Sequence, residues 1–259
     1  MIVVHANPGE IDPRSFQVFG MNVKPNTFNP IGYFGTGLKY AIAVLVRHGI
    51  EPRLFIGKDE YIFYTKKSDF RGKGFSQVCM KRKRWGFMSW SYHVLPFTTE
   101  LGKNWELWQA YRELHSNALD EGGGTNLLSK PHPEGNQTLF CIEDSRYQEV
   151  WNRRDSIFLS EEQLSKVIHE TRDVQVLRGA NNFVYYRGLQ IMKLRKPSQF
   201  TYNFLCSVDL TEDRTAKHPH WLEGQIAATI QASEDRAFLK RTVSSPPSNS
   251  YERSMSFGL

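Results

Sequence analysis

The sequence has few cysteines and no long apolar run. Its three cysteines, Cys79, Cys141 and Cys206, lie far apart and show no metal-ligand spacing. We interpret them as reduced thiols of a cytosolic protein. No stretch approaches the ~20 apolar residues that a membrane-spanning helix needs, and the first residues turn polar too soon for a signal peptide. We therefore expect a cytoplasmic protein that does not enter a membrane.

Several common catalytic motifs are missing as well. The chain has no Gly-Lys-Ser/Thr ending to a glycine-rich turn, so it is not a P-loop protein. It has no Gly-x-Ser-x-Gly elbow, which leaves a hydrolase triad without an anchor. His115 has no second His or Cys at ligand spacing, which argues against a zinc site.

The composition supports a folded core, and it does not decide whether the excess of basic residues binds a ligand. Hydrophobic residues make up 40% of the chain and aromatic residues 13%, while the net charge is +6. A basic balance permits contact with nucleic acid or with an acidic partner. The densest basic run is Lys81–Arg84, which precedes an aromatic stretch at 85–92. This run is either a phosphate-binding patch or the solvated end of a strand.

One predicted helix carries an unusual set of polar residues. Aromatic side chains occur at 105–111, and the glycines at 122–124 end the helix. Glu113, Asn117 and Asp120 then share one helix face. A carboxylate, an amide and a second carboxylate on one rigid element suit a base, a metal ligand and a polar anchor. A solvated helix face is the alternative.

A glycine-rich turn leads into another predicted helix. Gly32, Gly35 and Gly37 come before the apolar run at 40–46, which predicts a buried helix. Glycines at such a turn let the backbone approach an anion, and the first N–H groups of the helix point at it. Lys39 adds a positive charge. The turn therefore predicts a phosphate site, with an ordinary helix entry as the alternative.

Strands are predicted between residues 52 and 97 and again at 137–144. The second strand ends in Asp144, and Ser76 follows a Gly-x-Gly turn within the first group.

These motifs together resemble the GHKL ATPases, the superfamily of gyrase B subunits, MutL, histidine kinases and the ninety-kilodalton heat-shock chaperones. Glu113, Asn117, Ala118 and Asp120 are similar to its N-box, Glu-x-x-x-Asn-Ala-x-Asp. Residues 31–38, Ile-Gly-Tyr-Phe-Gly-Thr-Gly-Leu, resemble its second glycine box.

Two features depart from the family pattern. Asp144 is followed by Ser-Arg-Tyr-Gln, where the family has Asp-x-Gly-x-Gly. The glycine box also precedes the N-box, which reverses the familiar order. The reversal predicts a circular permutation, which a fold tolerates when its original termini lie close together.

The resemblance implies a site for ATP and Mg²⁺. Glu113 would orient or deprotonate the attacking water, and Asn117 would bind the metal. Asp144, backed by Asp120 or Ser76, would hold the adenine, although Ser76 is equally well an ordinary strand serine. The phosphate-binding set comprises Gly32, Gly35, Thr36, Gly37, Leu38 and Lys39.

The fold implied is α+β, a two-layer α/β sandwich of the Bergerat ATP-binding type with a mixed, mostly antiparallel sheet and helices on one face. We expect this core at 1–156, an α+β extension or small second domain at 157–243, and a flexible tail at 244–259. Within the second part, an N-cap at Ser160 predicts a helix that extends to about His169.

We accordingly predict an ATP-binding protein with slow Mg²⁺-dependent ATP hydrolysis that drives a conformational or partner-binding switch. The partner is an unidentified protein or a second copy of the chain in a homodimer. A partner-binding module that no longer hydrolyses ATP is the alternative, because the glycines after Asp144 are missing. A nucleic-acid-binding protein that uses Lys81–Arg84 is the third hypothesis.

Overall fold

The computed structural model describes residues 1–18, 36–211 and 213–257. The chain is an α+β protein that divides into two compact units, Met1–Asn152 (unit 1) and Arg153–Leu259 (unit 2). Unit 1 contains a seven-stranded sheet and unit 2 a three-stranded sheet. The sequence predicts this boundary a few residues later, after residue 156.

The sheet of unit 1 has the strand order β5-β4-β3-β2-β7-β1-β6. Every strand pairing that the described residues make in it is antiparallel. Its strands are β1 (Ile2–Pro8), β2 (Arg53–Ile56), β3 (Asp59–Phe70), β4 (Lys73–Lys83), β5 (Trp90–Thr98), β6 (Gly124–Leu128) and β7 (Gln137–Ile142).

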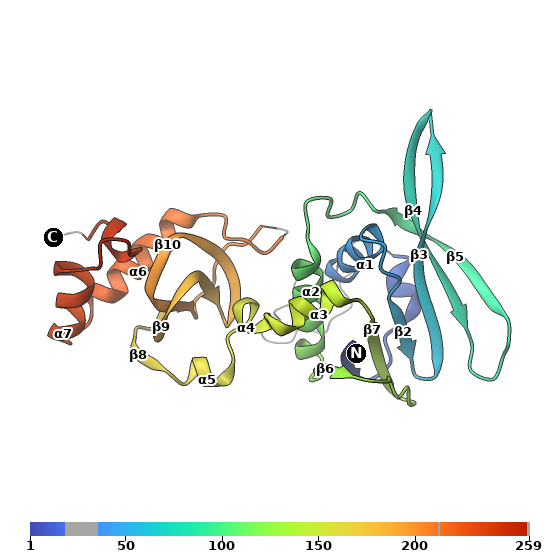
Figure 1. The fold of residues 1–259 in the computed structure, drawn as a ribbon, viewed down its shortest axis with the longest axis horizontal. Helices are drawn as coiled ribbons and strands as arrows, with labels where there is room; N and C mark the ends of the chain where they lie inside the picture. Colours follow the sequence, from blue (N-terminus) through green and yellow to red (C-terminus); the bar gives the residue numbers. More distant parts are fainter. Residues whose placement is uncertain (19–35, 212, 258–259) are drawn as a thin grey trace. The chain divides into compact units, whose positions relative to one another are not determined.

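The helices of unit 1 pack on one face of this sheet (Figure 1). They are η1 (Pro13–Phe16), α1 (Gly37–Arg47), α2 (Leu107–Asp120) and α3 (Ser145–Asn152). Helices α1 and α2 contact each other, α1 contacts β3, and α2 and α3 contact β1. Unit 1 is therefore a two-layer α/β sandwich.

Apolar side chains explain why α1 forms and where it stops. Residues 41–46 of α1 are all buried, as an apolar run without a polar stripe requires. Gly49 follows the helix with φ +74°, the left-handed conformation that glycine adopts at helix ends. Below the helix, Phe63 is fully buried and its ring stacks on that of Phe140.

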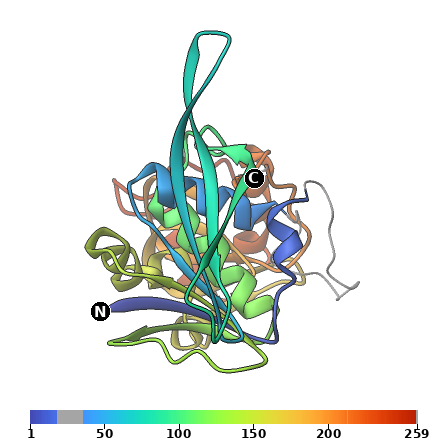
Figure 2. The same ribbon diagram turned by 90° about the vertical axis from the view of Figure 1, so that its right-hand side faces the viewer.

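The hairpin of β3 and β4 extends beyond its neighbours in the sheet (Figure 2). Strand β2 pairs with β3 only at Asp59–Ile62, and β5 pairs with β4 only from Gln77 onward. The hairpin closes through Arg71 and Gly72, both with positive φ. The Gly-x-Gly turn that the sequence predicts before Ser76 is confirmed at this position.

Unit 2 is built around two long, bent strands. Its strands are β8 (Val167–Glu170), β9 (Val174–Tyr186) and β10 (Leu189–Phe204). Tyr202 of β10 pairs with both Val176 and Val184 of β9. Because the end of β10 meets both halves of β9, the two strands curl around an apolar core. Helix α6 (Pro219–Gln231) packs Leu222, Ile226 and Ile230 into the same core.

Short helical elements complete unit 2: α4 (Arg154–Ile157), α5 (Glu161–Leu164), α7 (Arg236–Leu239), η2 (Lys240–Ser244) and η3 (Glu252–Ser254). The helix predicted up to His169 is wrong beyond Leu164, because Val167–Glu170 is the strand β8. In the segment predicted to be a flexible tail, Tyr251 and Glu252 are buried. In the described part of the chain, no helix has both the length and the apolar character to cross a membrane.

Candidate functional site

Glu113 lies in the interior of unit 1, held by its neighbour on α2. Its side chain is almost fully buried, and its Oε1 accepts hydrogen bonds from Nε and Nη2 of Arg112 at 3.3 and 3.2 Å. The Arg112 guanidinium is fully buried, 5.4 and 5.3 Å from the ring centroids of Trp105 and Trp108. Two aromatic rings and an ion pair therefore fix the Glu113 carboxylate in one place.

The same carboxylate meets the first residue of α1. A Cβ built on Gly37 would lie only 2.2 Å from Oε2 of Glu113. Such a distance is incompatible with any side chain at residue 37 unless Glu113 moves. Glycine is thus required at residue 37 by close approach, and this glycine lies against Glu113 of the polar helix.

The start of α1 has the features of an anion site. Thr36 precedes the helix, and its side chain makes no capping hydrogen bond. Uncapped N–H groups and the positive end of the helix dipole attract negative charge. Leu38 is half-buried, and Lys39 is buried, which lowers the pKa of its ammonium group. Gly32 and Gly35 lie outside the described residues.

Asn117 and Asp120 continue from Glu113 along α2. Both are half-buried, and their spacing places them on the same helix face as Glu113. Beside them, the Ser116 hydroxyl is fully buried and makes no hydrogen bond with any described residue.

Asp144 has the contacts of a helix N-cap. Its Oδ1 accepts from the backbone N–H groups of Arg146 and Tyr147 at 2.9 and 3.2 Å, at the start of α3. The Arg146 guanidinium donates to both carboxylate oxygens. The Arg146 hydrogen bonds, together with the backbone N–H of Tyr147, hold the pKa of Asp144 below its usual range.

Asp144 and Ser76 lie toward the other end of α1. Arg146 also donates to the carbonyl of His48, which follows the last residue of α1. The Ser76 carbonyl accepts from Thr99 N–H, and the Thr99 carbonyl accepts from Arg47 at the end of α1. The 11 residues of α1 span about 16 Å. The structure therefore brings Glu113 to Gly37, whereas Asp144 and Ser76 are each linked to the opposite end of α1.

Sequence reasoning missed a buried polar network on α2, the helix that carries Glu113. His5 is 2% exposed, and its ring nitrogens hydrogen-bond Tyr147 Oη at 2.9 Å and Thr125 Oγ1 at 2.7 Å. The same Thr125 hydroxyl is 2.8 Å from Nδ1 of His115. The Tyr111 ring stacks on His115 and contacts His5. The network joins β1, β6, α2 and α3, so it fixes the helix that carries Glu113 against the sheet.

The sequence contains one feature that indicates this network, a single His within an apolar strand. His5 follows Ile-Val-Val at the start of the chain, and a histidine within a buried strand needs hydrogen-bond partners. Those partners come from three other elements, and no local pattern identifies them.

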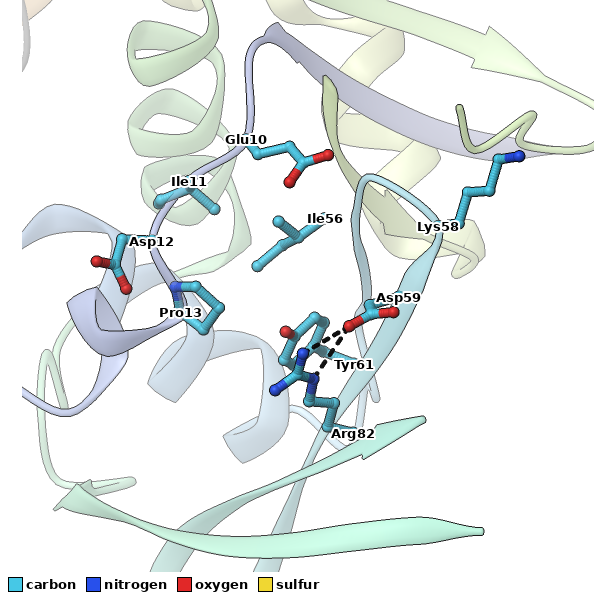
Figure 3. Close-up of a pocket in the computed structure, with 9 residues that line it drawn as sticks. All are labelled: Glu10, Ile11, Asp12, Pro13, Ile56, Lys58, Asp59, Tyr61 and Arg82. Carbon is cyan, nitrogen blue, oxygen red and sulfur yellow. Dashed lines mark hydrogen bonds and ion pairs between the residues drawn. The ribbon is translucent and has the colours of Figure 1, made fainter. Parts of the chain in front are cut away.

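A cavity of about 460 Å³ lies elsewhere in unit 1 (Figure 3). The Asp59–Arg82 ion pair closes one side of it at 2.6 Å, and Glu10 and Lys58 add charge to the rim. It contains none of the residues predicted to bind ATP or Mg²⁺, although Arg82 belongs to the basic run Lys81–Arg84. Among the described residues, no group of three or more His, Cys, Asp or Glu side chains is arranged to hold a metal ion.

Comparisons with models of protein families, with curated proteins and with solved structures find no match to this chain.

Proposed function

We propose that unit 1 binds ATP with Mg²⁺ where the N-terminus of α1 meets α2. The observation that carries the proposal is the contact between Glu113 and Gly37, which joins the two motifs resembling GHKL ATP-site boxes. Two motifs that lie far apart in the sequence support a common ligand site more strongly when the fold brings them into contact.

The donor set fits the proposed ligands. Mg²⁺ prefers hard oxygen ligands, and Asn117 supplies an amide oxygen on the helix face of Glu113. The metal would be held by Asn117 and would offset the charge of the phosphate oxygens. The start of α1 would face the phosphates with backbone N–H groups, and Lys39 would add a charge behind them.

Hydrolysis in this site requires one proton transfer by the chain itself. Glu113 would take a proton from water as the water oxygen forms a bond to the γ-phosphorus and ADP leaves. Arg112 is a positioning residue in this account, because it holds one oxygen of Glu113 and leaves the other toward Gly37. We place the protein in the cytosol, where ATP is supplied and where its free cysteines stay reduced.

Recognition of adenine by Asp144 and Ser76 stays a prediction. The Asp144 carboxylate is engaged by Arg146, so an adenine amino group would have to share Oδ2 or displace the guanidinium. Weaker ATP binding in Asp144→Asn would assign the adenine to this end of α1, and unchanged binding would remove it.

The second candidate is a module that binds ATP, switches its contact with a protein partner or a second copy, and does not hydrolyse. The ion pair between Glu113 and Arg112 favours it, because Oε1 of Glu113 already accepts two hydrogen bonds from the Arg112 guanidinium.

Phosphate release by Glu113→Ala separates the two candidates. We expect general-base removal to lower turnover by about 10²–10⁴-fold while ATP stays bound. The matched control is Glu121→Ala, which removes an exposed carboxylate at the end of the same helix. Asn117→Ala should lose nucleotide affinity as well. Wild-type binding without turnover would favour the module, and absence of both binding and turnover would contradict the proposal.

A further inference from the structure

Strands β3, β4 and β5 present a second face, opposite the helices. Tyr61 and Phe63 of β3 and Met80 of β4 point into the core under α1 and are buried. Because side chains alternate along a strand, the neighbouring positions point to the other side of the sheet. Strand register aligns these positions in rows across the three strands. We call this the open face, and its residues are Tyr64, Lys66, Lys81, Lys83, Trp90, Tyr92 and Val94.

The open face exposes apolar and aromatic surface. Tyr92 is 67% exposed and Val94 69% exposed, both on β5. The adjoining turn from β4 to β5 exposes Trp85, Phe87 and Met88 by 69%, 56% and 89%. Soluble chains keep aromatic residues exposed in this number mainly where they bind a partner.

Positive charge is concentrated on the same strands. Residues 53–94 contain ten Lys or Arg and three Asp or Glu, a net charge of +7, while the whole chain carries +6. On the open face itself, Glu60 is the acidic residue in the rows, opposite Lys83. The β3–β4 hairpin adds Lys67, Arg71 and Lys73.

Lysine and aromatic side chains are interleaved on this face. The ammonium groups of Lys81 and Lys83 lie 5.1 and 6.0 Å from the ring centroid of Trp90. Lys81 is also directly opposite Tyr92 in the sheet. Cationic groups therefore lie within a few ångströms of rings that stand on the same surface.

We propose that the open face binds single-stranded nucleic acid. Unpaired bases would stack on Tyr92 and Trp90, and Lys81 and Lys83 would contact the phosphates between them. A basic surface with aromatic stacking platforms is the general chemistry of single-strand binding on sheets. A second copy of the same face would bring like charges together, so self-association is disfavoured. The proposal goes beyond ATP binding and does not depend on it.

Fluorescence anisotropy with labelled dT15 and U15 oligonucleotides tests the proposal on the full chain. The wild type should bind at least one of them. The oligonucleotide with the higher affinity identifies the ligand as DNA or RNA. Tyr92→Ala and Trp90→Ala should each weaken binding by about five- to a hundred-fold, the effect of losing one stacked base. A duplex of the same length should compete poorly, because its bases cannot reach the rings.

Salt dependence supplies the second readout. Lys81→Gln/Lys83→Gln should lower the slope of log K against log salt by about 1.4, since each single-strand phosphate contact contributes about 0.7. Lys103→Gln/Lys130→Gln, which removes two exposed lysines that are not part of strands β3, β4 or β5, should leave the slope unchanged.

Three results would overturn the proposal: no binding of either oligonucleotide at low salt, aromatic variants that bind as tightly as the wild type, or equal competition by duplex. Loss of self-association in Tyr92→Ala, measured by sedimentation without any oligonucleotide binding, would assign the face to a second copy instead. ATP binding is measured separately on the same samples, so failure of either proposal is distinguishable from failure of the other.

Discussion

Gly37 is the residue on which the proposed ATP site depends most directly. Ala at this position would bring its Cβ against the buried Glu113 carboxylate. We expect Gly37→Ala to lower the free energy of unfolding by about 1–3 kcal/mol, the usual cost of overpacking, in urea titrations. Gly224→Ala is the control, because Gly224 is also helical and has open space around it, so Ala there should stabilise by up to about 1 kcal/mol.

A double-mutant cycle assigns the cost to the carboxylate. In the Glu113→Ala background the clash is gone, so Gly37→Ala should cost clearly less than in the wild type. An equal cost in both backgrounds would show that residue 37 is constrained by something other than Glu113.

His5 predicts a pH dependence of stability. Burial, followed by the nearby charge of His115, lowers the pKa of His5 well below its ordinary value of 6.5. The unfolded chain therefore binds a proton near pH 6.5 that the folded chain does not bind. The stability contribution is complete above pH 6.5 and is lost as pH falls below it, by up to about 1.4 kcal/mol per pH unit.

Urea titrations between pH 5 and 8 measure this effect. The fall below pH 6.5 should be shallower in His5→Gln, whereas His93→Gln, on the edge strand β5, should retain it. A profile that is identical in His5→Gln and the wild type would contradict the buried neutral His5.

The sequence is sufficient to predict that Asp144 caps a helix, but it does not predict which residues surround Asp144. An Asp followed by Ser-Arg and then an apolar helical pattern is an ordinary N-cap signal. The family resemblance implied adenine binding for Asp144 instead. The bidentate pair with Arg146 depends on the turn geometry and on the carbonyl of His48, which only the fold brings near.

Among the elements, helices and turns with a strong local signal could be predicted from the sequence. These are the apolar run of α1, the aromatic start of α2 and the turn at Arg71–Gly72. The helix predicted from Ser160 forms, but it ends at Leu164 for a tertiary reason. The local cap is present, since Ser160 Oγ accepts from Gln163 N–H, but Val167 pairs with β9 and takes the strand conformation.

The last residues of the chain differ most from the prediction made from their composition. Glu252 is fully buried and accepts hydrogen bonds from the hydroxyls of Ser198 and Tyr202 at 2.6 and 2.8 Å and from the backbone of Gln199. Ser and Pro residues before it predict a flexible segment, but one buried carboxylate with three donors anchors it to β10.

Truncation after Ser244 tests this anchor. Removal of Glu252 leaves buried donors of β10 without their acceptor, so unit 2 should lose at least about 3 kcal/mol of stability by chemical denaturation. Substitution of Ser248 by Ala, in the exposed part of the segment, is the control and should change little. A truncated chain as stable as the full one would restore the flexible-tail prediction.

At the scale of the whole molecule, the sequence indicated the α+β class but not the strand order. Strand β7 lies between β1 and β2, and β1 is bordered by the late strand β6. Such long-range pairings leave no local signal, because each strand alone only needs an apolar face. The chain divides after Asn152, a few residues before the boundary predicted after residue 156, and unit 2 has an apolar core of its own.

The ATP site stays a prediction, and one contact relevant to it is observed. Residue types and spacing singled out α2 and the start of α1, and Gly37 of α1 lies against Glu113 of α2. The ion pair with Arg112 between two tryptophans was not foreseen, because an Arg next to a Glu on a helix ordinarily points to solvent.

Calorimetric titration of the full chain with Mg²⁺ and ATP is the decisive experiment for the proposed ATP site. We expect saturable binding at one site in the wild type. We also expect retained binding in Gly224→Ala and a loss of at least about 100-fold in Gly37→Val, where a side chain would collide with the Glu113 carboxylate at the first residue of α1. Asn117→Ala, a milder change on a half-buried position, should weaken binding if Gly37→Val fails to fold. A wild type that gives no saturable heat, or an Asn117→Ala variant that binds ATP as the wild type does, would contradict the proposed ATP·Mg²⁺ site.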